Sequence, residues 1–303
     1  MDGAPPREVR ARCLHRRAAP RRPLARAAGA AYRPGVPAPR PTAAVEPVTT
    51  TAPPLRGPVI MGQRWCDLAF LHWAVPPERV RAWMPPGVRP DVVVGPDGEE
   101  RTYVGLVPFR LVGAGVGRGP AVPWLGTFWE TNVRLYSVDA TGRRGVVFAS
   151  LDASRLGVVL GARAAFGLPY RWARLRGHER VRDGARELLW TGATRWPGPR
   201  GARSRVAVRV GEPIADDAPD APLAAFLTAR WGLHTAHLGR TWHVPNEHGT
   251  WSLRRAEVLE LDDELLGAAG FGDLARRPPD HVAFAGGTTV RFGLPGSAGA
   301  PRR

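Results

Sequence analysis

Hydrophobic and polar residues alternate, or form short apolar runs, over most of the chain after residue 60, and both patterns are typical of strands. Most of these segments are bounded by Gly, Pro, Asp or Ser residues that favour turns. Two runs flank the Asp183-Gly184 turn and indicate a hairpin. The other predicted strands are 66–75, 102–111, 126–138, 145–152, 170–176, 206–210, 233–242, 252–261 and 281–292.

Helical spacing is confined to a few short segments. One follows Pro76-Pro77, and the others cover 154–166, 223–231 and 263–270. Ser154 is the expected N-cap of the second. Many strands with few short helices predict an α+β class, mostly antiparallel β, arranged as an open sheet or a closed barrel.

The first 60 residues differ from the rest of the chain in amino-acid composition. They hold 12 Pro and 13 Ala and neither Trp nor Phe, so they cannot bury enough apolar surface to offset chain entropy. We expect a disordered leader over 1–60, either an Arg-rich targeting segment or sequence upstream of a true start at Met61. A single domain should then cover 61–295, with a frayed tail over 296–303.

The net charge of +16 divides evenly between two very unequal parts of the chain. The leader has 11 Arg and 3 acidic residues, and residues 61–303 have 32 Arg and 24 acidic residues, so each part carries +8. The arginines of the second part are scattered among strands, which disfavours a specific nucleic-acid partner. Only two cysteines, Cys13 and Cys66, and no apolar run of membrane-spanning length predict a cytoplasmic protein without a membrane partner.

Two motif searches exclude common enzyme classes. The glycines of 113–119 are followed by Pro120 and Pro123, where a dinucleotide-binding loop would start its helix, and no G-x-S-x-G elbow occurs. We therefore expect no cofactor.

The histidines gather in one region, at His234, His237, His243 and His248. On one continuous strand, His237 and His243 would lie roughly 20 Å apart, and only a tight turn would bring them together. We therefore expect no metal site and interpret these side chains as surface or hydrogen-bonded histidines.

The strand at 127–136 has two contrasting faces. Period two places Thr127, Trp129, Thr131, Val133 and Leu135 on one face, which we interpret as core. The other face is either solvated or the polar, aromatic-edged lumen of a barrel. That second face carries Phe128, Glu130, Asn132, Arg134 and Tyr136.

Arg163 falls on the apolar stripe that Leu156, Val159 and Leu160 form along the predicted helix. An arginine in that position either extends to solvent or meets a buried acceptor. Glu130 and Asp152 are the candidate acceptors, in a structural ion pair or in a ligand site.

The end of this helix, Gly161-Ala-Arg-Ala-Ala-Phe-Gly-Leu-Pro-Tyr-Arg171, resembles the acetoacetate decarboxylase signature Gly-Arg-Glu-x-x-Gly-Phe-Pro-Lys-Lys. Arg163 falls on the arginine of that signature, Gly167 on its second glycine and Pro169 on its proline. Tyr170 stands where the signature has its Schiff-base lysine.

The chain departs from that signature at three further points. Arg171 replaces the neighbouring lysine, Ala164 replaces the glutamate, and the 303 residues contain no lysine at all. Schiff-base decarboxylation through a lysine is therefore excluded. Glu130, in the strand upstream, resembles an active-site glutamate of the family.

The chain also resembles an uncharacterised bacterial family, domain of unknown function 2071, which is similar to the decarboxylase fold. This resemblance implies a cone-shaped β-barrel with a central cavity and a few short helices. The matching pieces are Phe70-Leu-His-Trp73, Glu130-x-Asn-Val-Arg134, Ser150-Leu-Asp152, Ala162-Arg163 with Leu168-Pro-Tyr170, Phe226-Leu-Thr-Ala-Arg230 and His248-x-x-Trp251.

Together these patterns predict a protein that binds a small anionic molecule such as an oxo- or hydroxy-acid. Glu130 is the candidate base, Tyr170 a hydrogen-bond or proton donor, and Arg163 a carboxylate clamp, with Arg134 and His72 as further ligand-binding candidates. The alternatives are a lysine-independent lyase or isomerase that uses Glu130 and Tyr170, and a non-catalytic ligand sensor or structural module. The sequence leaves the oligomeric state open.

Overall fold

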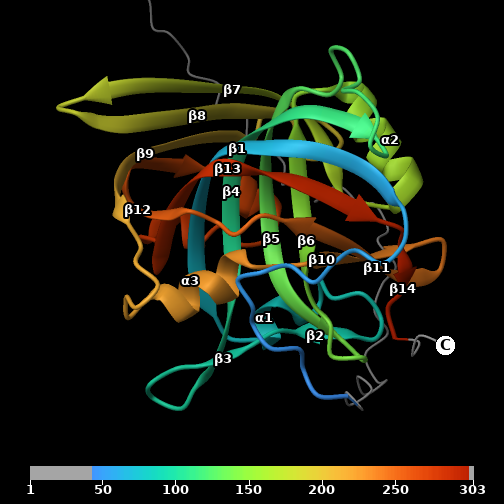
Figure 1. Cartoon of the computed structure of the whole chain (residues 1–303). Coiled ribbons are helices and arrows are strands. Elements are labelled where there is room, and N and C mark those ends of the chain that lie inside the picture. Colours follow the sequence, from blue (N-terminus) through green and yellow to red (C-terminus); the bar gives the residue numbers. More distant parts are fainter. Residues whose placement is uncertain (1–42, 300–303) are drawn as a thin grey trace, which may run out of the picture. The chain divides into compact units, whose positions relative to one another are not determined.

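Strands make up most of residues 43–299, the part of the chain that the computed structural model describes (Figure 1). The prediction of a mostly antiparallel β fold with few short helices is confirmed. The strands are β1 (Val59–Val75), β2 (Val88–Pro90), β3 (Val93–Val94), β4 (Glu100–Val116), β5 (Phe128–Asp139), β6 (Arg144–Ala153), β7 (Tyr170–Arg182), β8 (Ala185–Trp196), β9 (Arg203–Pro213), β10 (Gly232–His237), β11 (Arg240–His248), β12 (Leu253–Asp263), β13 (His281–Gly293) and β14 (Gly296–Ser297).

The helices are short, and the longest of those described packs with one buried residue. They are α1 (Glu78–Arg81), α2 (Leu156–Phe166), α3 (Ala221–Thr228), α4 (Leu265–Ala268) and the 3-10 helix η1 (Leu274–Arg276). In α2 only Val159 is buried, while Leu156 and Leu160 are exposed, so the expected apolar stripe is mostly at the surface. The helix ends where Gly167 adopts a φ of 65°, a left-handed conformation that glycine takes readily.

The expected N-cap of α2 is wrong. Arg155 occupies that position without a side-chain cap. The hydroxyl of Ser154 instead accepts a 3.1 Å hydrogen bond from the backbone N–H of Trp129 in β5. Ser154 therefore ties the end of β6 to β5.

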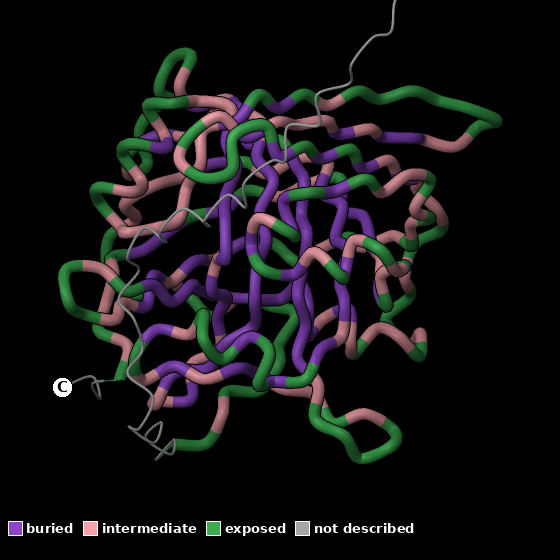
Figure 2. Tube along the Cα trace, turned by 180° about the vertical axis from the view of Figure 1, so that it is seen from behind, coloured by how far each residue is buried: buried purple, intermediate pink, exposed green. Residues whose placement is uncertain are grey.

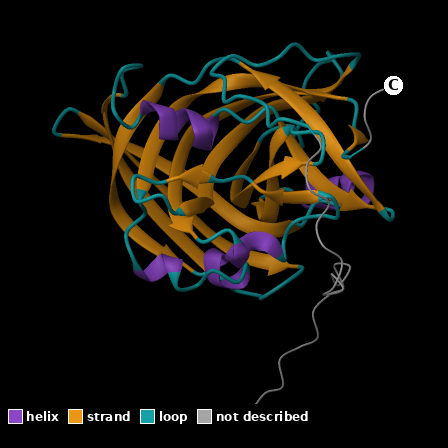
Figure 3. Cartoon of the chain, turned by 90° about the horizontal axis from the view of Figure 1, so that it is seen from below, coloured by secondary structure: helices purple, strands orange, loops and turns teal. Residues whose placement is uncertain are grey.

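Strand pairing closes into two rings that share five strands (Figure 3). The larger ring runs β5-β6-β7-β8-β9-β12-β13-β1-β4 and back to β5. The smaller ring leaves β6 for β10 and β11 and returns through β13, β1 and β4 to β5. Both rings close on themselves, so the shared strands have no free sheet edge along these pairings.

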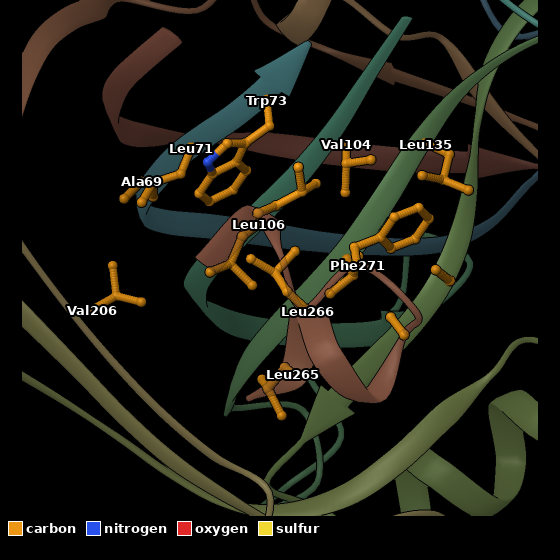
Figure 4. Close-up of a cluster of buried hydrophobic side chains, with 14 of the residues drawn as sticks. Ala69, Leu71, Trp73, Val104, Leu106, Leu135, Val206, Leu265, Leu266 and Phe271 are labelled. Atoms are coloured by element: carbon orange, nitrogen blue, oxygen red, sulfur yellow. The ribbon is translucent and has the colours of Figure 1, made fainter. Parts of the chain in front are cut away.

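The two faces of the shared strands line different cores. Ala69, Leu71 and Trp73 of β1 pack with β8, β9 and α4, as Figure 4 shows for part of the cluster. The alternate positions of the same strands meet β10, β11 and α3 through residues such as Tyr136 and Leu227. Figure 2 accordingly shows these central strands buried along most of their length.

The region predicted as one strand over 233–242 is a hairpin. Leu238 and Gly239 adopt φ values of 50° and 72°, and the chain reverses there between β10 and β11. The reversal places His234 opposite His243, with ring centroids 5.1 Å apart. A leucine in the left-handed region is uncommon, which is why the turn was not predicted from sequence.

The expected domain boundaries at residues 61 and 296 move outward. The N–H of Glu46 donates to the Gly142 carbonyl at 2.9 Å, and the N–H of Leu55 donates to Glu247 at 3.2 Å. At the other end β14 pairs with β11. Residues 1–42 and 300–303 of the expected leader and tail lie outside the described residues.

These contacts predict different stabilities for two truncations. Removal of residues 1–60 takes away the hydrogen bonds of 46–55 and the first two residues of β1, whereas removal of 1–42 takes away none of them. We expect a thermal midpoint several °C lower for the shorter protein, since each lost hydrogen bond costs about 1 kcal/mol. Equal midpoints in calorimetry would show that 43–60 does not stabilise the barrel.

Candidate functional site

Glu130 and Tyr170 meet inside the barrel wall. The Tyr170 hydroxyl donates a 2.9 Å hydrogen bond to Oε2 of Glu130. Strand β6 sets the alignment, since its Ala153 lies opposite Glu130 of β5 and its Leu151 opposite Tyr170 of β7. The carboxylate is 4% exposed. The two expected catalytic candidates therefore form one buried acid–phenol pair.

Burial, and to a smaller extent the nearby Asp152 carboxylate, raise the pKa of Glu130 to about 7, although hydrogen bonds from Tyr170 and Asn132 offset part of the effect. Burial and the adjacent Glu130 hold the pKa of Tyr170 well above its usual value. The phenol is therefore protonated at neutral pH and acts as a hydrogen-bond donor. Glu130 can both release and accept a proton near pH 7.

Arg163 lies beside this pair without contacting the Glu130 carboxylate. Its Nη1 donates a 2.9 Å hydrogen bond to the Tyr170 carbonyl, and its guanidinium lies 5.8 Å from the Trp196 ring centroid. No ion pair joins Arg163 to Glu130 or Asp152 among residues 43–299. The expected buried ion pair is wrong, because α2 leaves most of its stripe exposed. Arg163 fixes the start of β7 instead.

Asp152 belongs to the opposite face of the sheet. It is fully buried and accepts a 2.6 Å hydrogen bond from the Thr194 hydroxyl. Burial raises its pKa to about 6, although that hydrogen bond and the positive charge of Arg171 work against the rise. Arg171 follows Tyr170 directly and therefore points to the other side of β7. The signature segment thus supplies Tyr170 to one core and Arg171 to the other.

Arg134 and His72 form a second cluster, centred on Tyr136. The Arg134 guanidinium donates to the Leu227 carbonyl at 2.8 Å and to the Tyr136 hydroxyl at 3.2 Å. The same hydroxyl lies 2.7 Å from Nε2 of His72, whose Nδ1 lies 3.0 Å from Nδ1 of His281. The side chains expected to bind ligand here already hold one another and the end of α3.

The two histidines of this second cluster have lowered pKa values. Burial first, and then the neighbouring His281 and Arg134, hold the pKa of His72 well below its usual value. Burial lowers the pKa of His281 to about 4. Both imidazoles are neutral at neutral pH, so one ring donates and the other accepts in their contact.

Gly105 makes the second cluster sterically possible. It lies between the two strands, opposite both His72 of β1 and Arg134 of β5. A Cβ at this position would lie 3.0 Å from the His72 ring and 3.2 Å from the Arg134 side chain. The absence of a side chain lets the imidazole and guanidinium pack over the backbone of β4.

The two clusters occupy the same face of β5 but are separate. Glu130 and Arg134 are four residues apart, or roughly 13 Å along a strand. Asn132 lies between them, and its Oδ1 has no hydrogen-bond partner within the described chain. This buried oxygen is available to a polar ligand that reaches between the clusters.

Several residues of the second cluster were not predicted as site residues. Arg230 lies over the rings of Phe226 and Tyr136, at 4.2 and 4.8 Å from their centroids. Its Nη1 also pairs with Asp91 at 2.5 Å. The family motif Phe226-Leu-Thr-Ala-Arg230 was the signal that could have marked this position, since periodicity gives no information about a residue just beyond a helix end.

The histidine-rich hairpin holds hydrogen-bonded side chains. Nδ1 of His234 lies 2.9 Å from the Ser137 hydroxyl, and its Nε2 lies 3.6 Å from Asp139. His248 lies against Trp231 and Trp251, with ring centroids 4.4 and 4.7 Å away. Within residues 43–299 no three His, Cys, Asp or Glu side chains are placed to hold a metal ion. None of the helices described there is long and apolar enough to cross a membrane.

A cavity of about 450 Å³ lies beside the acid–phenol pair. Phe128 and Trp172, each two residues from Glu130 or Tyr170 on its strand, belong to the lining. Glu130 and Tyr170 themselves do not. The described cavity is thus beside the pair and not centred on it.

Comparison with known sequences identifies a family. The model of the family DUF2071, described as an uncharacterised conserved protein, matches residues 62–289. The uncharacterised protein YqjF of Bacillus subtilis (strain 168) is 30% identical over 200 residues, which are 66% of this chain and 77% of YqjF.

Comparison with solved structures identifies the fold. An acetoacetate decarboxylase-like enzyme from Sphingomonas wittichii RW1 matches with a TM-score of 0.54 at 14% identity, over 78% of this chain and 92% of that one. The enduracididine biosynthesis enzyme MppR, complexed with the condensation product of pyruvate and imidazole 4-carboxaldehyde, matches with a TM-score of 0.51 at 14% identity, over 80% and 91%. The barrel therefore has the acetoacetate decarboxylase-like fold.

The raised pKa of Glu130 predicts a pH-dependent gain from Glu130→Gln. Below the unfolded pKa of the carboxyl group, the folded protein holds a neutral acid at no penalty. The penalty for burying its charge grows as pH rises toward the folded pKa of about 7. We expect similar thermal midpoints near about pH 4 and a higher midpoint for the variant near about pH 8.

The control for this measurement is Glu212→Gln, which removes the same charge from an exposed position of β9. Its midpoint should follow that of the parent protein at both pH values. A Glu130→Gln midpoint that also follows the parent at both values would contradict a raised pKa at Glu130.

The position of Arg163 predicts a small cost for Arg163→Met. The variant loses one hydrogen bond to the Tyr170 carbonyl and exposes no buried carboxylate. We expect a loss of about 1 kcal/mol in the free energy of unfolding, measured by urea denaturation. A loss of several kcal/mol would instead indicate that Arg163 neutralises Glu130 in solution.

Proposed function

Because the chain belongs to the DUF2071 family and has the acetoacetate decarboxylase-like fold, we propose that it binds a small oxo- or hydroxy-acid and exchanges a proton with it at Glu130. This is a lysine-independent isomerase or lyase type of chemistry. The observation that carries the proposal is the 2.9 Å hydrogen bond between the Tyr170 phenol and a buried carboxylate whose pKa is about 7.

The two groups suit complementary steps of one reaction. Glu130 in its ionised form takes a proton from the carbon next to the ligand carbonyl, and the C–H electron pair moves into the carbonyl to give an enolate. Tyr170, held protonated, turns its O–H from Glu130 to the developing oxyanion. Return of the proton from Glu130 to either end of the enolate regenerates both groups, so no co-reactant is needed.

The absence of lysine limits how the ligand carbonyl can be activated. No side-chain amine of the chain can form an imine with the ligand, so the carbonyl has to be activated by hydrogen bonding. Asn132, with a free Oδ1 next to Glu130, is a further group that can orient the ligand. The related fold of MppR was solved with a pyruvate-derived compound, which supports an oxo-acid as the class to test first.

Proton exchange with solvent tests the proposal. The protein is incubated in D₂O with pyruvate and with 2-oxobutyrate, and loss of the C3 proton signal is followed by NMR. We expect Glu130→Gln to slow exchange roughly 100-fold or more. Tyr170→Phe should slow it by a smaller factor and leave the thermal midpoint nearly unchanged, since it removes only a hydroxyl.

Glu212→Gln is the matched control and should exchange at the parent rate. Exchange that is equally fast in Glu130→Gln would contradict the proposal. Binding of the oxo-acid without any exchange, seen by saturation-transfer NMR, would support the non-catalytic ligand sensor instead.

A further inference from the structure

The cavity of about 450 Å³ beside the acid–phenol pair is lined by four arginines, and we propose that it is a separate binding site for a small, multiply charged anion. The arginines are Arg110, Arg155, Arg174 and Arg195. The rest of the lining is Thr127, Phe128, Trp129, Ser154, Trp172, Ala173 and Leu175, so it includes no acidic side chain.

The four arginines share one cavity, and none of them has a carboxylate partner there. Across residues 43–299 other strand arginines pair with acids, as Arg205 does with Glu260 and Arg255 with Asp220. None of the four cavity arginines takes part in an ion pair within the same stretch. Four positive charges converge there without compensation, which a bound anion would supply.

Tryptophans of the lining lie against two of these four guanidinium groups. The Arg195 guanidinium lies 4.6 Å from the Trp172 ring centroid, and that of Arg110 lies 5.7 Å from the Trp129 ring centroid. A guanidinium stacked on an indole keeps its N–H groups in its own plane, where they remain free to donate to an anion. Stacking therefore lowers the entropic cost of fixing each donor when a ligand binds.

A β-bulge lies at Arg195, beside the cavity. In the β7–β8 ladder Trp172 pairs with Trp196 and Ala173 pairs with Thr194, so Arg195 is the extra residue. A bulge breaks the strict alternation of side chains and turns one of them out of register. Arg195 keeps to the side of Trp172, and its guanidinium lies 4.6 Å from the Trp172 ring centroid.

The cavity shape favours a small molecule over a polymer. Its lining includes three buried apolar residues, Phe128, Ala173 and Leu175, which are all at most 8% exposed. The volume lies in the range of small-ligand sites, about 300–1,000 Å³. A single carboxylate would leave most of the arginine charge uncompensated, so the ligand class is one with two or more phosphate or carboxylate groups.

This inference does not depend on the proton exchange proposed at Glu130. Phe128 and Trp172 belong to the lining, but Glu130 and Tyr170 do not. The anion site is defined by residues of β4, β5, β7 and β8 and by the segment before α2. It would remain if the acid–phenol pair had only a structural role.

The test is isothermal titration calorimetry on the full chain with pyrophosphate, citrate and acetate. We expect pyrophosphate or citrate to bind at least about tenfold more tightly than acetate, and pyrophosphate against citrate tells phosphate from carboxylate ligands. The double variant Arg174→Gln/Arg195→Gln should weaken binding about tenfold or more. The control, Arg240→Gln/Arg276→Gln, removes two exposed arginines elsewhere and should change it less than about twofold.

Three results would overturn the inference. One is the lack of binding by either multivalent anion, and another is equal weakening in the pocket and control variants, which would indicate general charge attraction. The third is tighter binding of a single-stranded oligonucleotide that the pocket substitutions abolish, which would assign the arginines to a nucleic acid. Unchanged thermal midpoints in both variants confirm that loss of binding is not loss of fold.

Discussion

Burial of both faces of the shared sheet is the constraint on which the rest of this structure depends. Strands β1, β4, β5 and β6 belong to two closed rings at once, so along most of their length they have no solvated side. In β5 every residue except the half-buried Trp129 is buried. A polar side chain on these strands needs a hydrogen-bond partner inside the barrel, and an ionisable one without such a partner has its pKa shifted, because an unpaired buried charge is costly.

The polar residues of β5 satisfy this constraint in two different ways. Arg134 and Tyr136 bond to each other, to His72 and to the end of α3, so little of their hydrogen-bonding capacity is left for a ligand. Glu130 has only Tyr170 and Asn132 to stabilise its charge, and its pKa rises to about 7. The first arrangement stabilises the fold, while the second creates a group that can exchange protons. A single strand thus carries a structural cluster and a reactive one on the same face.

The fold brings part of the positive charge of the protein together in one place. A net charge of +16 in the chain as a whole says little about function, since many arginines pair with acids, as Arg205 and Arg209 do. The tertiary structure brings four arginines together around Phe128 and Trp172, in a cavity whose lining includes no acidic residue. They come from three strands and the segment before α2, and their spacing along the chain gives no sign that they converge. Arg195, the extra residue of a bulge in β8, lies over the Trp172 ring.

The sequence by itself determined the strands, the absence of lysine chemistry and the pairing of Glu130 with Tyr170 as candidates, because alternation and family motifs are local properties of the chain. Only the tertiary structure decided which groups touch. Arg163 bonds to a backbone carbonyl and not to Glu130, since the stripe of α2 is mostly exposed. His234 meets His243 because the chain reverses at Leu238, a residue that rarely adopts the required backbone conformation. Neither contact follows from alternation, because the first depends on how α2 packs and the second on where the chain reverses.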